Sequence, residues 1–223
     1  MSLRLEKQGT IARLSIDRAD KRNAFTQAMW EAFPMLLDEA MADSAVRIVI
    51  LQSAAPGVFC AGADIVEFST GTLDPAWRTL NQAAIRKAQF ELARAPKPVI
   101  ALIDGDCVGG GCGLAIACDI RIASPRARFG ITPAKLGLVY SLHDTKLLVD
   151  LVGPAQAKRM LFSGQLLSGE EAQRIGLVEI VSDDVEGEGA ALAAIIAANS
   201  SYAVRGIKEI VRRILDEIGR AHV

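Results

Sequence analysis

The sequence has few of the residues that build disulfide frameworks, metal sites and nucleic-acid surfaces. Among 223 residues there are four cysteines and two histidines. The cysteines are too sparse for a disulfide framework and lack C-x-x-C spacing, so we expect reduced packing residues and no metal site. Basic and acidic residues number 25 and 26, which leaves no overall field to attract nucleic acid.

Long apolar runs are also missing. No stretch approaches the roughly 20 apolar residues of a membrane-spanning helix, and the first residues include Arg4 and Lys7 in place of an apolar leader. We therefore expect a cytoplasmic protein without a membrane partner. The 51% of hydrophobic residues is typical of a compact protein, and the length suits one large domain or one domain with a helical appendage.

Apolar periodicity predicts alternating strands and helices, and hence an α/β fold. Thr26 is a candidate N-cap, and Pro34 predicts a kink in the helix that follows. The acidic, glycine-bearing stretch from Ser182 to Gly189 is the best candidate for a linker. Strands are predicted at residues 10–17, 47–52, 99–103 and 120–123, and helices at residues 26–40, 74–95, 155–163, 170–175 and 202–218.

Two glycine-bearing loops carry the strongest chemical signal. Residues 105–113 contain three consecutive glycines between a predicted strand and a predicted helix, and residues 59–64, Phe-Cys-Ala-Gly-Ala-Asp, follow another strand. Glycine lets backbone amides approach a ligand, and the first turn of a helix offers unpaired N–H groups to negative charge. The two loops could aim amides at one developing oxyanion; the alternative is a tight turn with close packing.

Five short motifs follow one another along the chain: Lys21-Arg-Asn-Ala24, Phe59-Cys-Ala-Gly-Ala-Asp64, Gly109-Gly-Gly-Cys112, Ala117-Cys-Asp119 and Phe129-Gly130. In this order they resemble the crotonase superfamily, which includes enoyl-CoA hydratases and isomerases. The resemblance covers about residues 10–182. It implies a crotonase-type spiral of strand-strand-helix units with a C-terminal helical segment, a homotrimer or dimer of trimers, and an acyl-CoA substrate. It divides the chain into an acyl-CoA-binding core, 1–182, and a trimerisation or lid segment, 183–223.

The same resemblance implies roles for individual residues. The backbone N–H groups of Ala63 and Gly110 would donate to the thioester oxygen. No cofactor would be tightly bound, because coenzyme A is part of the substrate. The residues implied to line the path of coenzyme A are Arg22, Ala24, Ala61, Asp64, Ile65 and Gly109.

The two glutamates that hydratases of this family use as acid and base are absent. Gly113 stands at the first position and Pro133 at the second, and neither can move a proton. The segment that follows, with Thr132 and Tyr140, resembles the methylmalonyl-CoA decarboxylase branch, in which the matching residues face the substrate carboxylate. The chain departs from that branch at Ala63, where a histidine is expected, and at Gly113, where a glutamate is expected.

Loss of carbon dioxide from a malonyl-type thioester needs an electron sink and no general base. Tyr140 is the first candidate for orienting the carboxylate or for protonating the enolate. Thr132 and Ser141 are hydrogen-bonding neighbours, and His143 is a second candidate acid. The alternative is a structural role for each, with His143 and Asp144 capping a helix; Ser141, His143 and Asp144 are too close in sequence to form a nucleophilic triad.

The sequence therefore favours an acyl-CoA enzyme that holds a thioester enolate and decarboxylates a malonyl-type substrate. The first alternative is an enoyl-CoA hydratase or isomerase with atypical catalytic residues. The second is a non-catalytic acyl-CoA-binding scaffold that has lost both glutamates.

Overall fold

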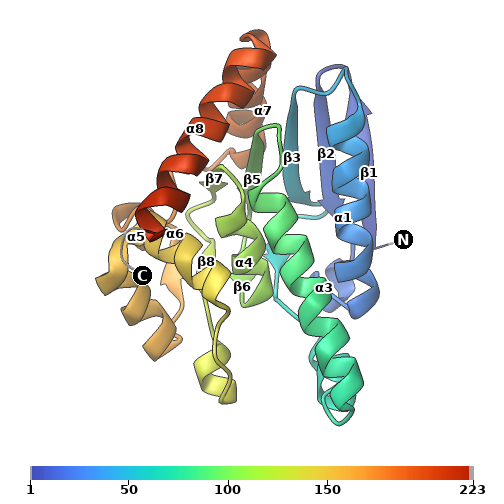
Figure 1. The fold of residues 1–223 in the computed structure, drawn as a ribbon, viewed down its shortest axis with the longest axis vertical. Helices are drawn as coiled ribbons and strands as arrows, with labels where there is room; N and C mark the ends of the chain where they lie inside the picture. The colour runs from blue at the N-terminus through green and yellow to red at the C-terminus, as the bar shows by residue number, and fades with distance from the viewer. Residues whose placement is uncertain (1, 221–223) are drawn as a thin grey trace.

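Two β-sheets form the framework of the chain, of which a computed structural model describes residues 2–220 (Figure 1). In the larger sheet the order is β1-β2-β3-β5-β7-β10; β1 pairs antiparallel with β2, and the other pairs are parallel. Its strands are β1 (Leu3–Gln8), β2 (Ile11–Ile16), β3 (Ile48–Ser53), β5 (Val99–Ile103), β7 (Ile120–Ala123) and β10 (Ile180–Val181). The smaller sheet contains β4 (Val58–Cys60), β6 (Asp106–Val108), β8 (Arg128–Gly130) and β9 (Leu167–Ser168).

The connections confirm the strand-strand-helix repeat. Three times in succession a strand of the larger sheet is followed by a strand of the smaller sheet and then by helices. β3 and β4 lead to α2 (Ile65–Gly71) and α3 (Pro75–Ala93), β5 and β6 lead to α4 (Gly110–Ala117), and β7 and β8 lead through η2 (Pro133–Leu136) to α5 (Leu142–Ser163). The remaining elements before β10 are η1 (Ala19–Lys21), α1 (Gln27–Ala42) and α6 (Gly169–Arg174).

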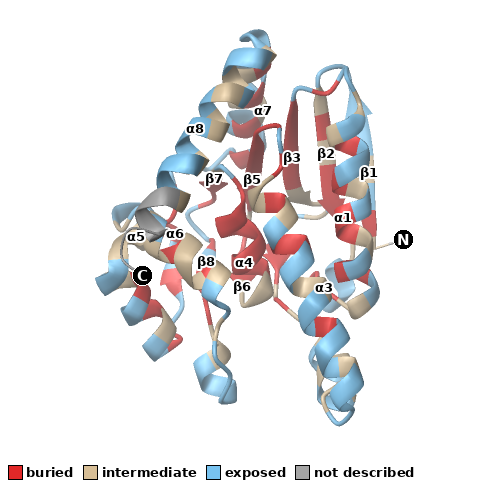
Figure 2. Cartoon of the chain, in the orientation of Figure 1, coloured by how far each residue is buried: buried red, intermediate tan, exposed pale blue. Residues whose placement is uncertain are grey.

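Helices cover both faces of the larger sheet, which explains why its central strands are apolar without alternation. Every residue of β5 is buried (Figure 2). On one face Ile50 and Ile100 pack in a cluster with Ala193 of α7 (Val185–Ala198). The linker expected at 182–189 is wrong, because most of this stretch forms the first turn of α7. A Cβ on Gly189 would overlap Leu102, so glycine here permits close packing of helix on sheet.

Two of the predicted helices differ in how well they match the structure. α1 is confirmed, with the Thr26 hydroxyl accepting from the amide of Met29 (3.3 Å); Pro34 lies inside it without ending it. The helix predicted at 155–163 is only the second half of α5, which begins after the N-cap Ser141 and bends at Gly153, where φ is +73°. The backbone leaves the helical conformation at Gly153, and the apolar periodicity of the helix is therefore interrupted there.

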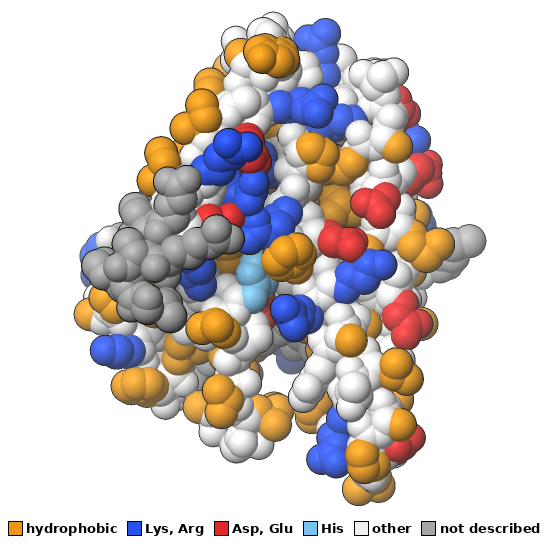
Figure 3. All heavy atoms as spheres, in the orientation of Figure 1, with side chains coloured by type: hydrophobic (Ala, Val, Ile, Leu, Met, Phe, Trp, Pro, Cys, Tyr) orange, Lys and Arg blue, Asp and Glu red, His pale blue; other side chains and the backbone are white. Residues whose placement is uncertain are grey.

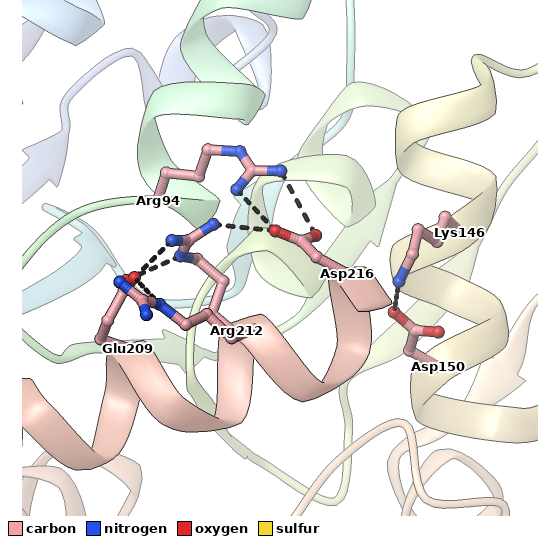
Figure 4. Close-up of polar contacts among 7 residues, drawn as sticks. Arg94, Lys146, Asp150, Glu209, Arg212 and Asp216 are labelled. Atoms are coloured by element: carbon pink, nitrogen blue, oxygen red, sulfur yellow. Dashed lines mark hydrogen bonds and ion pairs between the residues drawn. The ribbon is translucent and has the colours of Figure 1, made fainter. Parts of the chain in front are cut away.

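The C-terminal helix α8 (Ser201–Arg220) is held to the body by ion pairs. Asp216 pairs with Arg94 (3.1 Å; Figure 4), and Lys208 pairs with Asp119 (2.7 Å). Between these pairs and α4 and α5 lies a hollow of about 570 Å³. The division into 1–182 and 183–223 stays a prediction, as does the oligomeric state; residues 221–223 lie outside the described part of the chain.

No single helix within residues 2–220 is long and apolar enough to cross a membrane. α7 and the first part of α8, Ser201–Asp216, reach that threshold only together, and they are bent by 106° relative to each other.

Candidate active site

The first loop follows β4 and approaches α1. The amide of Phe25 donates to the carbonyl of Gly62 (2.7 Å), and the amide of Asp64 donates to the carbonyl of Phe25 (2.9 Å). In this parallel bridge the intervening residue, Ala63, directs its own amide to the opposite side. The amide of Ala63 therefore points away from Phe25, as an oxyanion donor requires.

The second loop follows β6 and opens α4. Gly109, with φ +56°, is the N-cap, and Gly110 is the first helical residue, whose N–H has no acceptor within the helix. A Cβ on Gly62, which has φ +95°, would lie 3.3 Å from the nitrogen of Gly110. The two loops thus touch at glycine, and the amides of Ala63 and Gly110 are neighbours.

Packing also requires the consecutive glycines of the second loop. A Cβ on Gly110 would lie 2.9 Å from the Trp30 ring, and a Cβ on Gly111 would overlap the carbonyl of Cys60. Gly109 supplies the left-handed backbone. Tight packing and exposed amides, which the sequence presented as alternatives, are both present.

A buried asparagine beside Arg22 ties the first loop to the turn after η1. Asn23 is fully buried, has φ +54°, and donates to the carbonyls of Val58 and Phe59 at 3.3 and 3.0 Å. The amide of Ala61 then donates to the carbonyl of Arg22 (3.0 Å). The motif alone gives no role to Asn23; a non-glycine residue with positive φ at a buried position is its structural signature.

The residues expected to line the coenzyme A path lie around these two loops. Arg22 forms an ion pair with the buried Asp106. The carboxylate of Asp64 caps α2 by accepting from the amide of Glu67 (3.1 Å), and it pairs with Arg18 (2.8 Å), which lowers the pKa of Asp64. The coenzyme A role stays a prediction for Arg22, Ala24, Ala61, Asp64, Ile65 and Gly109; Ala24 is buried and Ile65 is exposed.

The positions of the two absent glutamates lie on α4 and η2. Gly113 is one turn after Gly110 and on the same face of the helix. Pro133 begins η2, directly after Thr132, which is half-buried. Figure 3 shows the surface hollowed between η2 and the N-terminal end of α3, beside this part of the molecule. Glu67, the acidic residue in the first turn of α2, accepts from the amide of Gln27 (2.7 Å) at the start of α1.

Tyr140 lies against the face of α4 that carries Gly113. A Cβ on Gly113 would be 3.0 Å from the Tyr140 hydroxyl. That oxygen is buried and has no hydrogen-bond partner among the described residues. Burial raises the pKa of Tyr140 well above 10, and the nearby Asp144 raises it further. Tyr140 is therefore a hydrogen-bond donor at neutral pH and not a base.

The segment after Tyr140 forms a cap and no nucleophilic triad. The Ser141 hydroxyl donates to Asp144 (2.7 Å) and accepts from its amide (3.0 Å). The Nε2 atom of His143 is buried and has no partner in the described chain. Burial lowers the pKa of His143, although Asp144 opposes that shift. At neutral pH His143 is thus a weaker source of protons than an exposed histidine.

Gln89 of α3 is the residue that sequence analysis missed. Its side chain fills the space next to Gly113, where a Cβ would overlap the Gln89 amide. With that amide in the orientation that satisfies its neighbours, Gln89 donates to both oxygens of Asp144, at 2.8 and 3.1 Å. Gln89 lies within an amphipathic helix, and nothing in its local spacing distinguishes it from a surface glutamine.

The four cysteines are free and buried. Burial raises the pKa of Cys60 and of Cys118 to about 12 in each case. The thiolate is the nucleophilic form, so these side chains pack and do not attack. Within residues 2–220, no cluster of three or more His, Cys, Asp or Glu side chains is placed to hold a metal ion.

A model of the enoyl-CoA hydratase/isomerase family matches residues 6–222 of the chain. The chain belongs to this family. Among solved structures, a putative enoyl-CoA hydratase/isomerase family protein from Hyphomonas neptunium is similar with a TM-score of 0.94 and 36% identity, over 96% of this chain and 82% of that one. This confirms the crotonase-type fold.

Two curated relatives of the chain are named as hydratases. The mitochondrial methylglutaconyl-CoA hydratase of Mus musculus is 34% identical over 83% of this chain, which spans only 58% of the length of that relative. The short-chain-enoyl-CoA hydratase of Clostridium acetobutylicum is 36% identical over 94% of this chain and 80% of its own length. The chain is thus a member of the hydratase/isomerase family, and neither of these names points to decarboxylation.

Proposed function

We propose that the chain binds an acyl-CoA thioester, stabilises its enolate with the amides of Ala63 and Gly110, and decarboxylates a malonyl-type substrate. The observation that carries the proposal is the pair of adjacent glycine-opened amides beside two positions, Gly113 and Pro133, that hold no carboxylate. The thioester carbonyl takes up the electron pair released when the carbon–carbon bond breaks, and the two amides donate hydrogen bonds to the oxyanion that forms. One such donor contributes roughly 3 kcal/mol to transition-state stabilisation.

Tyr140 suits the substrate carboxylate. Its buried hydroxyl lacks a partner within the described chain and lies against Gly113, which follows Gly110 by one turn on the same face of α4. A carboxylate held there by one neutral donor is poorly solvated, which favours loss of carbon dioxide. We assign Thr132, the residue before η2, to the same group. No tightly bound cofactor is needed, because coenzyme A arrives with the substrate.

The second candidate is hydration of an enoyl-CoA. The names of the relatives favour it, and the acid-base pair would then consist of residues other than the usual glutamates. Homotrimer or dimer-of-trimers assembly and a cytoplasmic location accompany either proposal.

Product analysis separates the candidates. The purified chain is mixed with methylmalonyl-CoA and, separately, with crotonyl-CoA, and the products are followed by mass spectrometry. Propionyl-CoA from the first substrate supports decarboxylation. Hydration of crotonyl-CoA without decarboxylation contradicts it in favour of the second candidate. Binding without either reaction identifies a scaffold.

The oxyanion account is tested separately with Gly110→Pro against Gly110→Ala. Both variants place a Cβ against Trp30, and proline is tolerated at the first position of a helix. Only proline removes the N–H. We expect proline to lower kcat by about 10²–10³ relative to alanine; equal kcat values in two folded variants would refute the role of Gly110.

A further inference from the structure

A buried carboxyl lies behind the space that the first missing glutamate leaves. Asp144, in the first turn of α5, is 3% exposed, and Gln89 on α3 is 1% exposed. Gln89 reaches the position next to Gly113 on α4 with one end of its amide and donates to both oxygens of Asp144 with the other. Gln89 therefore links the Gly113 position on α4 to the carboxyl group on α5.

Asp144 has hydrogen-bond donors and no cation. Ser141 donates to one of its oxygens (2.7 Å), and Gln89 donates to both. Within the described chain no lysine or arginine forms an ion pair with it. Burial accordingly raises the pKa of Asp144, although Ser141 and His143 oppose that shift. A buried carboxyl without a cation is expected to hold a proton more readily than an exposed one.

Asp144 lies near enough to Tyr140 to raise the pKa of its hydroxyl, and that hydroxyl lies against Gly113. Gly113 follows Gly110 by one helical turn on the same face, and Gln89 and the Tyr140 hydroxyl both lie against Gly113. A glutamate at position 113 would be excluded by Gln89. The acidic group in this region comes instead from α5, as Asp144.

We propose that Asp144 is the acid of this site, exchanging a proton with the α-carbon of the bound thioester, and that Gln89 is its positioning residue. This rests on the enolate function proposed above. During protonation the O–H bond of Asp144 breaks, the electron pair of the enolate forms the new C–H bond, and Asp144 becomes a carboxylate. Solvent returns the proton. In the reverse step the carboxylate removes an α-hydrogen and restores the enolate.

The other titratable and charged groups near Asp144 lie on or beside α3, α4 and α5. On its own segment, His143 and Tyr140 are the titratable neighbours. Arg86 on α3 and Arg94 at its C-cap act on His143, and Cys112 on α4 acts on Tyr140. Burial raises the pKa of Tyr140 and lowers that of His143, so these two neighbours shift in opposite directions, and loss of a titration in Asp144→Asn is what assigns it to Asp144.

The test is exchange of α-hydrogen for deuterium in propionyl-CoA dissolved in D₂O, measured by mass spectrometry with the full chain. We expect Asp144→Asn to lower the exchange rate by about 10²-fold or more, with binding of propionyl-CoA retained in calorimetry. Asp144→Glu should recover part of the rate. Asp150→Asn is the matched control, because Asp150 lies on the same helix, paired with Lys146 away from this cluster (Figure 4).

The pH profile distinguishes an acid-base role from helix capping. Exchange begins with the carboxylate form, so the rate should rise with pH and level off above the pKa of Asp144; Asp144→Asn should remove that rise. Gln89→Ala should displace the rise along the pH axis.

Retained exchange in a folded Asp144→Asn variant, or an unchanged pH profile, would overturn the role of Asp144. If the variant still decarboxylates methylmalonyl-CoA at the wild-type rate, the proposed function holds and only the role of Asp144 is lost. A wild-type chain that binds thioesters but neither exchanges nor turns over would overturn both.

Discussion

Tyr140→Phe should raise stability and lower activity. The Tyr140 hydroxyl is buried without a partner in the described chain, and an unpaired buried polar group costs about 1–3 kcal/mol. Phenylalanine keeps the ring and removes the hydroxyl. We expect the free energy of unfolding to rise by about 1 kcal/mol, which corresponds to about 2–4 °C in Tm for a chain of this size.

The activity should change in the opposite direction, because the hydroxyl is the donor offered to the substrate carboxylate. We expect kcat for methylmalonyl-CoA to fall by about 10²-fold or more, as for loss of a proton-transferring or charge-stabilising group. Thermal and urea unfolding measure the first effect, and propionyl-CoA production measures the second. Tyr202→Phe is the matched control, since Tyr202 is 91% exposed on α8.

The two measurements together decide the assignment. A variant that is destabilised and fully active would show that the hydroxyl has a structural partner and no catalytic task. A stabilised variant with unchanged kcat would show that Tyr140 fills space beside Gly113 and does not contact the substrate.

Three other features give expected outcomes. Gly113→Ala should lower the free energy of unfolding by about 1–3 kcal/mol, because the new methyl overlaps Gln89; in a Gln89→Ala background the loss should be smaller in urea unfolding, and equal losses would contradict the overlap. The Cys60 thiol, with a pKa of about 12, should resist iodoacetamide at neutral pH until urea is added; rapid labelling of the folded chain would refute its burial. Arg126 lowers the pKa of Asp104 from 3.8 to about 2. The pair therefore stabilises the fold at pH values above 3.8 and loses this effect as the pH falls toward 2. Arg126→Gln should flatten this part of an acid unfolding curve followed by circular dichroism, whereas an unchanged curve would refute the pairing.

Local signals predicted most of the fold. The central strands are apolar runs because both faces of the sheet are covered, and α1 and α6 begin at side-chain caps visible in the sequence, Thr26 and Ser168. α7 was missed because its first turn is acidic and glycine-bearing, features that are typical of a linker. Its identity depends on Leu102 of a distant strand, against which Gly189 packs; no local pattern contains that contact.

The parts of the candidate site that are formed by backbone amides could be predicted from the sequence. The parts that are formed by side chains from separate helices could not. The amides of Ala63 and Gly110 follow from loop motifs, because glycine is required for the close approach of one loop to the other. The pairing of Gln89 with Asp144 joins α3 to α5 across α4. Sequence proximity instead grouped Asp144 with Ser141, which does bind it, but as a helix cap.

The absence of a glutamate at Gly113 therefore does not by itself remove acid chemistry from this face of α4. A glutamate needs room beyond its Cβ, and Gln89 occupies that room while holding a carboxyl from another helix. Because glycine at 113, glutamine at 89 and aspartate at 144 occupy one continuous buried volume, restoring the glutamate alone should displace Gln89 and release Asp144. Gly113→Glu is consequently expected to disrupt the acid that is present before it can supply another, and a gain of hydration in that single variant would show that the two acidic positions are independent.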